Sequence, residues 1–342
     1  MLSSRGTLRN MPTSGIKTGT AKPFDVSNLI TGIHHVTALA SDAQRNVDFY
    51  TGVLGLRLVK KTVNFDAQGV YHFYYGDETG SPGSIITFFP YSGLVKGRHG
   101  KGYLNTTTFS LAYNALDFWI ARLKRFNINS KEPQERFARE VVIYLEDPDG
   151  LGLELVFNDR DQRQGFSYGQ IPAEHSIKGF YNVEIWVEGY ERTAAVLTEQ
   201  LNHTLISETG NRFRFAARDV PGNYVDLLCA PDSLKGRNGS GTVHHIAFAT
   251  PDEQTQLEVR EKINERLLNP TPILDRQYFR SIYFREPGGV LFEIATTDDT
   301  FSKDENIQYL GEALKLPPWF EKDRMTIEKG LPPVSLHVEK YK

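Results

Sequence analysis

The sequence predicts an α+β protein built from four βαβββ modules, which assemble into two domains of paired sheets. Residues 32–40 and 241–249 each contain a doubled histidine and repeat one another 210 positions apart. A second repeated feature is a proline-containing turn that opens an apolar strand, found at Pro82, Pro148, Pro221 and Pro287. Since each turn closes one unit of about fifty-five residues, four turns predict four modules.

Each module opens with a strand and then a helix. After residues 32–40 and 241–249, the segments starting at Ser41 and Thr250 have capping-box spacing, the second with Pro251 at the first helical position. In modules two and three, strands over 105–112 and 179–187 precede amphipathic helices over 116–123 and 193–201. Three more strands fit the remaining length of each module. They form a curved antiparallel sheet whose open face needs a partner or a ligand.

Composition divides the chain into segments. The basic, acid-poor start has no apolar region typical of a secretion signal and is expected to be a disordered leader. The successive parts are the leader (1–27), modules one and two (28–157), a polar linker (158–175), modules three and four (176–300) and a C-terminal helical tail (301–342). Within the tail we expect helices over 305–316 and 320–330 that cover a sheet face.

The charge balance argues against two classes of partner. There are 39 basic and 42 acidic residues, a net charge of −3, so nothing favours nucleic acid or an anionic membrane surface. No stretch approaches the roughly 20 apolar residues of a membrane span. The single cysteine, Cys229, lies in an apolar run and predicts a reducing, cytoplasmic setting. A small neutral or weakly anionic ligand fits best.

Alternation along the strands predicts which histidine of each pair faces a cavity. In the first strand Val36 shares a face with His34, which is therefore expected to lie under the helix while His35 points into the cavity. In module four the same alternation turns His244 toward the helix and His245 toward the cavity.

One carboxylate joins these histidines. Glu293 stands on an otherwise apolar strand of module four and faces the cavity. Two imidazoles and a carboxylate form the facial triad of non-haem Fe(II) sites, which leaves positions open for substrate and dioxygen. The sequence therefore predicts an iron site at His35, His245 and Glu293, with Mn(II) as the alternative ion.

Comparison of the modules predicts how they pair. When residues are counted from the proline turns, the residues equivalent to Glu293 are Phe88, Glu154 and Leu227 in modules one, two and three. The residues equivalent to His35 are Thr107 in module two and Asn182 in module three. Only modules one and four supply the full ligand set, so they should pack together and leave modules two and three as a second pair. Glu154 is then expected to be a surface or salt-bridged carboxylate.

Several motifs occur in the order typical of one known family. They are residues 29–56, 71–83 and 171–175, the pair His244-His245, and residues 276–293. On these motifs the chain resembles the vicinal oxygen chelate superfamily, also called the glyoxalase, bleomycin-resistance and extradiol-dioxygenase superfamily. Within it, residues 30–330 resemble the dioxygenases that cleave the rings of hydroquinones.

The resemblance implies the vicinal oxygen chelate fold and iron bound by His35, His245 and Glu293. It also implies roles beside the metal for His34, Thr37, His244, Arg276 and Tyr283. Alternation alone puts both His34 and His244 on the helix side, so a distorted strand is needed to bring them to the site. Arg276 and Tyr283, seven residues apart on a predicted strand, need a bulge to share a face.

The resulting hypothesis is an Fe(II)-dependent, extradiol-type ring-cleaving dioxygenase that acts on a small aromatic diol and O2. One alternative is a glyoxalase-type lyase or isomerase, which would need a fourth protein ligand where Phe88 is expected. Another is a metal-free binding or resistance protein. Assembly into a homo-oligomer stays open. His72, set among aromatic residues, is expected in the core or the pocket wall.

Overall fold

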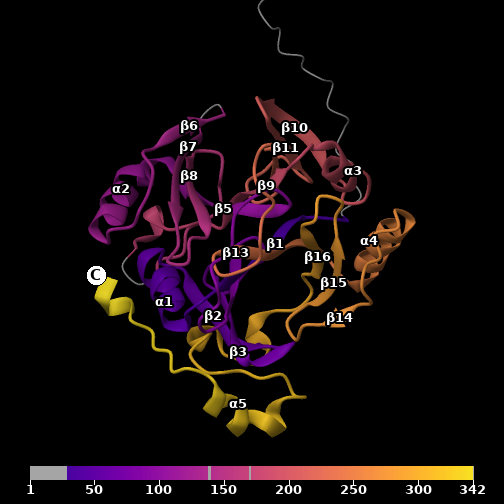
Figure 1. Ribbon diagram of the computed structural model, residues 1–342. Helices are drawn as coiled ribbons and strands as arrows, with labels where there is room; N and C mark the ends of the chain where they lie inside the picture. Colours follow the sequence, from indigo (N-terminus) through magenta and orange to yellow (C-terminus); the bar gives the residue numbers. More distant parts are fainter. Residues whose placement is uncertain (1–28, 138–139, 169–170, 342) are drawn as a thin grey trace, which may run out of the picture.

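The computed structural model describes residues 29–137, 140–168 and 171–341, so the leader expected over 1–27 lies outside the described residues. Two mixed eight-stranded sheets make up the body of the molecule (Figure 1). The first contains, in spatial order, β14 (Leu274–Asp275), β15 (Arg280–Arg285), β16 (Leu291–Thr296), β13 (Thr242–Thr250), β1 (Gly32–Ala40), β4 (Ile85–Pro90), β3 (Ala67–Gly76) and β2 (Arg57–Asn64). The second contains β10 (Thr204–Thr209), β11 (Arg212–Ala216), β12 (Tyr224–Cys229), β9 (Phe180–Val187), β5 (Tyr103–Ala112), β8 (Gly152–Asn158), β7 (Glu140–Glu146) and β6 (Gln134–Arg136).

The strand order confirms the predicted fold and the pairing of its modules. Modules one and four share the first sheet and meet where β1 runs antiparallel to β13. Modules two and three share the second sheet through β5 and β9. The first and last quarters of the described body therefore contribute side chains to one sheet face. The domain boundaries at the linker stay a prediction.

One helix follows the opening strand of each module. They are α1 (Ala43–Val47, continued by a π-helix over Asp48–Val53), α2 (Leu116–Arg125), α3 (Glu191–Glu199) and α4 (Glu253–Glu265). Helices α1 and α2 lie on one side of the molecule and α3 and α4 on the other (Figure 1). The capping prediction was wrong in detail: Asp42 and Asp252 cap α1 and α4, and Pro251 precedes the cap.

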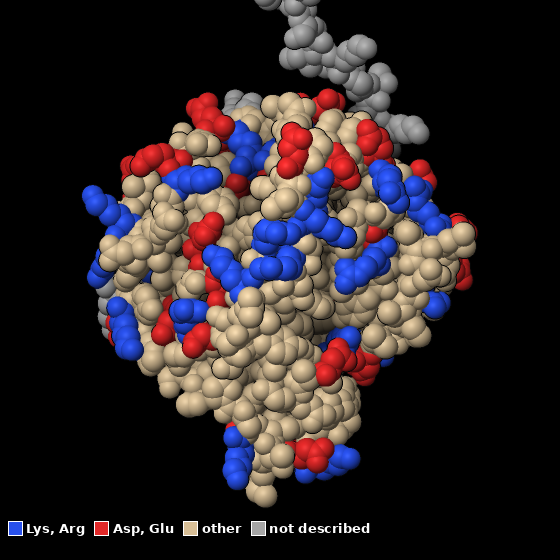
Figure 2. Space-filling model, in the orientation of Figure 1, with Lys and Arg blue, Asp and Glu red and all other residues tan. Residues whose placement is uncertain are grey.

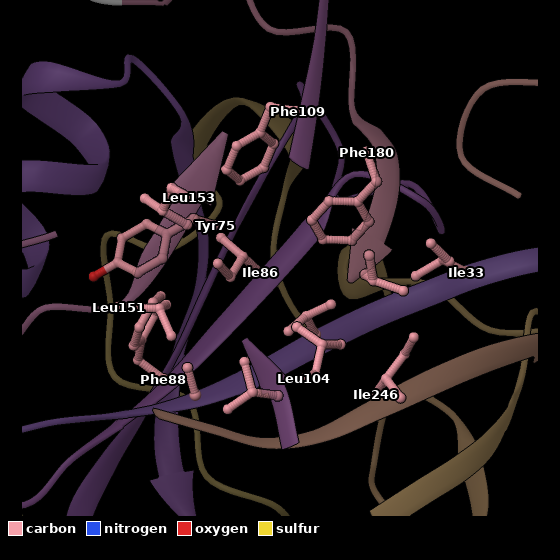
Figure 3. Packing of buried hydrophobic residues seen from close by; sticks show 14 of the residues in the cluster. Ile33, Tyr75, Ile86, Phe88, Leu104, Phe109, Leu151, Leu153, Phe180 and Ile246 are labelled. Atoms are coloured by element: carbon pink, nitrogen blue, oxygen red, sulfur yellow. The ribbon is translucent and has the colours of Figure 1, made fainter. Parts of the chain in front are cut away.

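The two sheets share one hydrophobic core (Figure 3). Ile33, Ile86 and Ile246 of the first sheet belong to the same cluster as Phe109 and Phe180 of the second, whose ring centroids are 5.5 Å apart. The apolar face of each sheet packs into this core. The opposite, more polar faces are therefore the ones available for binding sites.

The C-terminal segment differs from the prediction. A three-residue 3-10 helix, Ile307–Tyr309, replaces the helix expected over 305–316. The chain instead runs beside the edge strand β2, because the buried Lys60 of that strand donates hydrogen bonds to Asp304 and Glu305 at 2.7 and 2.5 Å. Farther on, α5 (Arg324–Gly330) forms within the second expected helix and lies near β3 (Figure 1).

Charged side chains of both signs are visible on the face shown in Figure 2, in keeping with the near-neutral composition. Among the described residues, no helix is long and apolar enough to cross a membrane.

Candidate metal centre

Three side chains from the two ends of the described chain meet on the polar face of the first sheet. His35 lies on β1, His245 on β13 and Glu293 on β16, and all three are buried. The Nε2 atoms of the two histidines are 3.2 Å apart. Oε2 of Glu293 lies 3.4 Å from Nε2 of His35 and 2.9 Å from Nε2 of His245. These distances bring the three side chains predicted as ligands to one point.

The arrangement fits a divalent ion. Ligand atoms about 2.1 Å from an ion and at right angles to each other are about 3 Å apart, as these are. Oε1 of Glu293 accepts a hydrogen bond from Ser281 at 2.5 Å, whereas Oε2 is buried with no hydrogen-bond partner among the described residues. A buried carboxylate oxygen without a donor calls for a cation. His35, His245 and Glu293 are therefore a sound donor set for a metal.

The protonation states of the side chains at this site favour the binding of a cation. Burial alone would raise the pKa of Glu293, but the neighbouring His35 and His245 outweigh it and hold the pKa well below its usual range. Burial lowers the pKa of His245. The carboxylate is therefore charged and the imidazole of His245 neutral at neutral pH, the protonation states that metal ligands need.

Two bulges resolve the conflict between His34 and His244 and strict alternation. Between β1 and β13, residues 34 and 35 together oppose Ala247, and the register shifts again at His244. A bulge lets consecutive side chains share a face. Nδ1 of His34 lies 2.9 Å from Nδ1 of His35, and Nδ1 of His244 lies 2.8 Å from Nδ1 of His245.

These contacts set the tautomers. With Nε2 of His35 and His245 free for an ion, each Nδ1–H donates to the preceding histidine. Loss of contact with water lowers the pKa of both His34 and His244 to about 3, although part of the His244 side chain stays exposed, so both are neutral acceptors. Nε2 of His244 then carries its proton, and His244 lines the cavity.

Arg276 and Tyr283 also meet, by a different route from the expected bulge. Arg276 lies in the turn after β14, and its Nε donates to the hydroxyl of Tyr283 on β15 at 3.2 Å. Both side chains line the cavity. Thr37 is buried on β1, with Oγ1 2.8 Å from Oγ1 of Thr87. The roles of these residues in catalysis stay predictions.

The metal centre opens into a cavity of about 460 Å³. Its apolar walls come from Leu39, Phe65, Phe89, Leu94, Phe279 and Leu291. Polar groups also line the cavity, among them His72 and Tyr74, and these can orient a ligand held against the apolar walls. Sequence reasoning placed His72 in the core or the pocket wall and named no partner for it. It missed Tyr74 and Thr87, although alternation on one strand puts residues 72 and 74 on the same face.

The strand register corrects the comparison between modules. Glu293 pairs with Ala247, two residues beyond His245. The same offset in module one selects Thr87, which pairs with Thr37, rather than Phe88. In the second sheet it selects Glu154, Asp226, Thr106 and Asn182. The reason is that the turns at Pro82 and Pro221 are one residue shorter than the other two, so counting from proline slips by one position in those modules.

At the equivalent place in the second sheet, arginines lie against the buried carboxylates. Arg136 forms two hydrogen bonds with Glu154, at 2.5 and 2.7 Å, which agrees with the expected salt-bridged carboxylate. Asp226 accepts hydrogen bonds from Arg212 and Arg214. Each buried carboxylate there has a permanent counter-charge.

The model of the Glyoxalase/Bleomycin resistance protein/Dioxygenase superfamily matches residues 32–155 and 179–294. The chain belongs to this superfamily. The two matched stretches correspond to modules one and two and to modules three and four, which confirms the resemblance seen in the sequence.

Individual members of the superfamily are similar along nearly the whole chain. MhqO of Bacillus subtilis, named as a candidate ring-cleaving dioxygenase, is 41% identical over 302 residues, which cover 88% of this chain and 96% of MhqO. The chlorohydroquinone/hydroquinone 1,2-dioxygenase of Sphingobium indicum is 32% identical, with 85% and 93% covered. The crystal structure of a candidate dioxygenase from Bacillus subtilis is 40% identical, with a TM-score of 0.86 over 90% of this chain and 98% of that one.

Proposed function

We propose that this protein is a ring-cleaving dioxygenase that binds one divalent ion, Fe(II) by preference, and acts on a hydroquinone-type aromatic diol with O2. The observation that carries the proposal is the three-ligand site at the base of an aromatic-lined cavity. A facial triad keeps neighbouring coordination positions free for a substrate oxygen and O2. The names of the similar Bacillus and Sphingobium proteins support the same reaction class.

When bound, the ion would bring the electron-rich ring and O2 together and let charge pass between them. The protein's own residues hold the reactants and supply protons. Tyr283 keeps its proton, because burial raises its pKa above the usual value. Since Arg276 donates to the phenolic oxygen, the Tyr283 O–H can point into the cavity toward the reacting carbon–oxygen group.

His244 offers a second donor. Its Nδ1 is held by His245, so its Nε2–H is available to a substrate oxygen in the cavity. Arg276 carries a fixed positive charge that balances negative charge developing on the ring oxygen. We assign the cleaved bond to the one beside the hydroxyl-bearing carbon nearest the ion, which is the extradiol-type outcome expected from the sequence.

Thr87 argues against glyoxalase-type chemistry. A glyoxalase-type lyase or isomerase would need a fourth protein ligand, a carboxylate, in module one. The register places a threonine at that position. The hydroxyl of Thr87 is engaged with Thr37 and His72. A coordination position therefore stays free for O2 chemistry.

The proposal can be tested on protein purified without oxygen and loaded separately with Fe(II) and Mn(II). Oxygen uptake is measured with hydroquinone and with catechol, and the products are analysed by mass spectrometry. We expect Fe(II)-dependent uptake with hydroquinone and a product heavier by two oxygen atoms. Glu293→Gln is the matched control and should show no uptake. Absence of uptake with every diol, in protein that holds the ion, would overturn the proposal.

A further inference from the structure

A chain of hydrogen bonds crosses the polar face of the first sheet, beside the metal centre. The hydroxyl of Tyr74 lies 2.9 Å from Nδ1 of His72, and Nε2 of His72 lies 2.9 Å from Oγ1 of Thr87. Oγ1 of Thr87 lies 2.8 Å from Oγ1 of Thr37. Four polar side chains on three neighbouring strands, β3, β4 and β1, are thus connected without a break.

The sheet register explains why these side chains meet. Tyr74 pairs with Thr87, and Thr87 pairs with Thr37, so all three occupy one row across the sheet. His72 is two residues before Tyr74 and shares its face. Its ring packs between Phe89 and Tyr74, with centroid distances of 4.4 and 4.0 Å.

The chain reaches the cavity at the Tyr74 end. His72 and Tyr74 both line the cavity, but both nitrogens of His72 are already engaged. The phenolic oxygen of Tyr74 is therefore the atom of this pair that remains open to a ligand. Strand β3 is two strands from β1, about 9.5 Å across the sheet, so a ring held at His35 can extend toward Tyr74.

The direction in which the hydrogen bonds of this network are donated determines which ligand groups Tyr74 can bind. The phenolic hydroxyl is more acidic than a threonine hydroxyl and is the stronger donor, so its proton belongs in the bond to Nδ1 of His72. Nε2–H of His72 then donates to Thr87. With its proton engaged, the Tyr74 oxygen presents only lone pairs to the cavity. It accepts a hydrogen bond from a hydroxyl and cannot donate one to a carbonyl.

We propose that Tyr74, oriented by His72, is the acceptor for the second hydroxyl of the ring, the one far from the metal. The inference rests on the proposed function and adds a specificity site to it. Tyr74 would favour a ring with two hydroxyls over one with a single hydroxyl. It would also favour the hydroquinone over the corresponding quinone, whose carbonyl oxygen finds no donor there. His72 is the positioning residue, because its neutral ring fixes the direction of the Tyr74 O–H.

The test is anaerobic binding to the Mn(II)-loaded full-length protein, measured by titration calorimetry with hydroquinone, phenol and p-benzoquinone. A neutral hydrogen bond of this kind changes affinity about three- to tenfold. We expect hydroquinone to bind more tightly than phenol by about that factor, and the quinone, which also lacks the hydroxyl held at the ion, to bind more weakly still. Tyr74→Phe, which keeps the ring packed against Phe301, should abolish the preference over phenol. Tyr71→Phe alters another tyrosine of β3, whose hydroxyl donates to the carbonyl of Pro332 and does not line the cavity, and should leave the preference unchanged.

Two variants of His72 separate positioning from packing. His72→Asn places an amide oxygen near the former Nδ1 and gives Tyr74 an acceptor, so the preference should stay within about twofold of the wild type. His72→Gln reaches toward Thr87 instead and should lose the preference. Equal losses in both variants would overturn the positioning role. An unchanged preference in Tyr74→Phe would overturn the whole inference, even where oxygen uptake confirms ring cleavage. If hydroquinone does not bind to the loaded wild type, the inference and the proposed function both fail.

Discussion

The ion pair between Arg136 and Glu154 offers a quantitative test of how the second sheet is stabilised. The guanidinium contacts both carboxylate oxygens, and the side chains are 22% and 5% exposed. Arg136→Met leaves Glu154 buried with Thr108 as its remaining hydrogen-bond donor in the described chain. Breaking a fully buried pair costs about 3–5 kcal/mol, and the partial exposure of Arg136 reduces this to about 2–4 kcal/mol.

A loss of that size is measurable by calorimetry. For a unit of 150–250 residues, 1 kcal/mol shifts the melting temperature by about 2–4 °C, so Arg136→Met should melt roughly 4–16 °C below the wild type. The double variant R136M/E154L removes both charges and should return to within about 1 kcal/mol of the wild type. Metal content and oxygen uptake should not change, because the pair lies in the other sheet.

Three results would refute this reasoning. A single variant that melts with the wild type would show that the pair contributes nothing at this site. A double variant as unstable as Arg136→Met would show that packing, rather than an unpaired buried charge, causes the loss. Binding of less metal by Arg136→Met would show that the two sheets are coupled in a way that the separate networks do not suggest.

Three further predictions concern the metal centre and the buried histidines. Mn(II) at a hundredfold excess over its dissociation constant should stabilise the wild type by about 2.7 kcal/mol, seen as a higher melting temperature, and should leave Glu293→Gln unchanged. His34→Phe removes the acceptor for Nδ1–H of His35 and should weaken metal affinity about 10- to 100-fold in competition with a chelator, whereas unchanged affinity would contradict the assigned tautomers. Burial lowers the pKa of His203 to about 4, so as pH falls from about 6.5 to 4 the unfolded chain takes up a proton that the folded chain refuses. As the pH is lowered over this range, the free energy of unfolding of the wild type should therefore decrease more steeply than that of His203→Phe, by up to about 1.4 kcal/mol per pH unit. Urea unfolding at several pH values measures both slopes, and equal slopes would contradict the prediction.

The sequence predicted the fold because the repeats are explicit. The doubled histidines and the four proline turns recur at fixed places, and the strands and helices around them follow ordinary alternation and helical periodicity. The ligand set could be derived in the same way. His35 and His245 stand at equivalent positions of two modules, and Glu293 interrupts an apolar strand.

What sequence reasoning missed depends on register and on long-range charge. Residue order alone carries no signature of the bulges at His34 and His244, which were expected only from the family resemblance, because each bulge arises from how β1 and β13 pair. Because the turn at Pro82 is one residue shorter than the turn at Pro287, counting from proline selected Phe88 instead of Thr87. The helix expected over 305–316 has the right periodicity, but the charge of Lys60, some 245 residues away, holds the chain in another conformation.

The two sheets satisfy one electrostatic requirement in two ways. Both bury carboxylates on the polar face of a sheet: Glu293 in the first, Glu154 and Asp226 in the second. A buried carboxylate is costly without a positive partner. In the second sheet arginines supply the charge, and the positions of the ligand histidines hold Thr106 and Asn182, which are poor metal ligands. In the first sheet two imidazoles with Nε2 atoms facing the site and an oxygen without a donor leave the charge to be supplied by an ion. An exchangeable ion, unlike a guanidinium, keeps free positions for reactants, which is why we place the proposed reaction in the cavity of modules one and four.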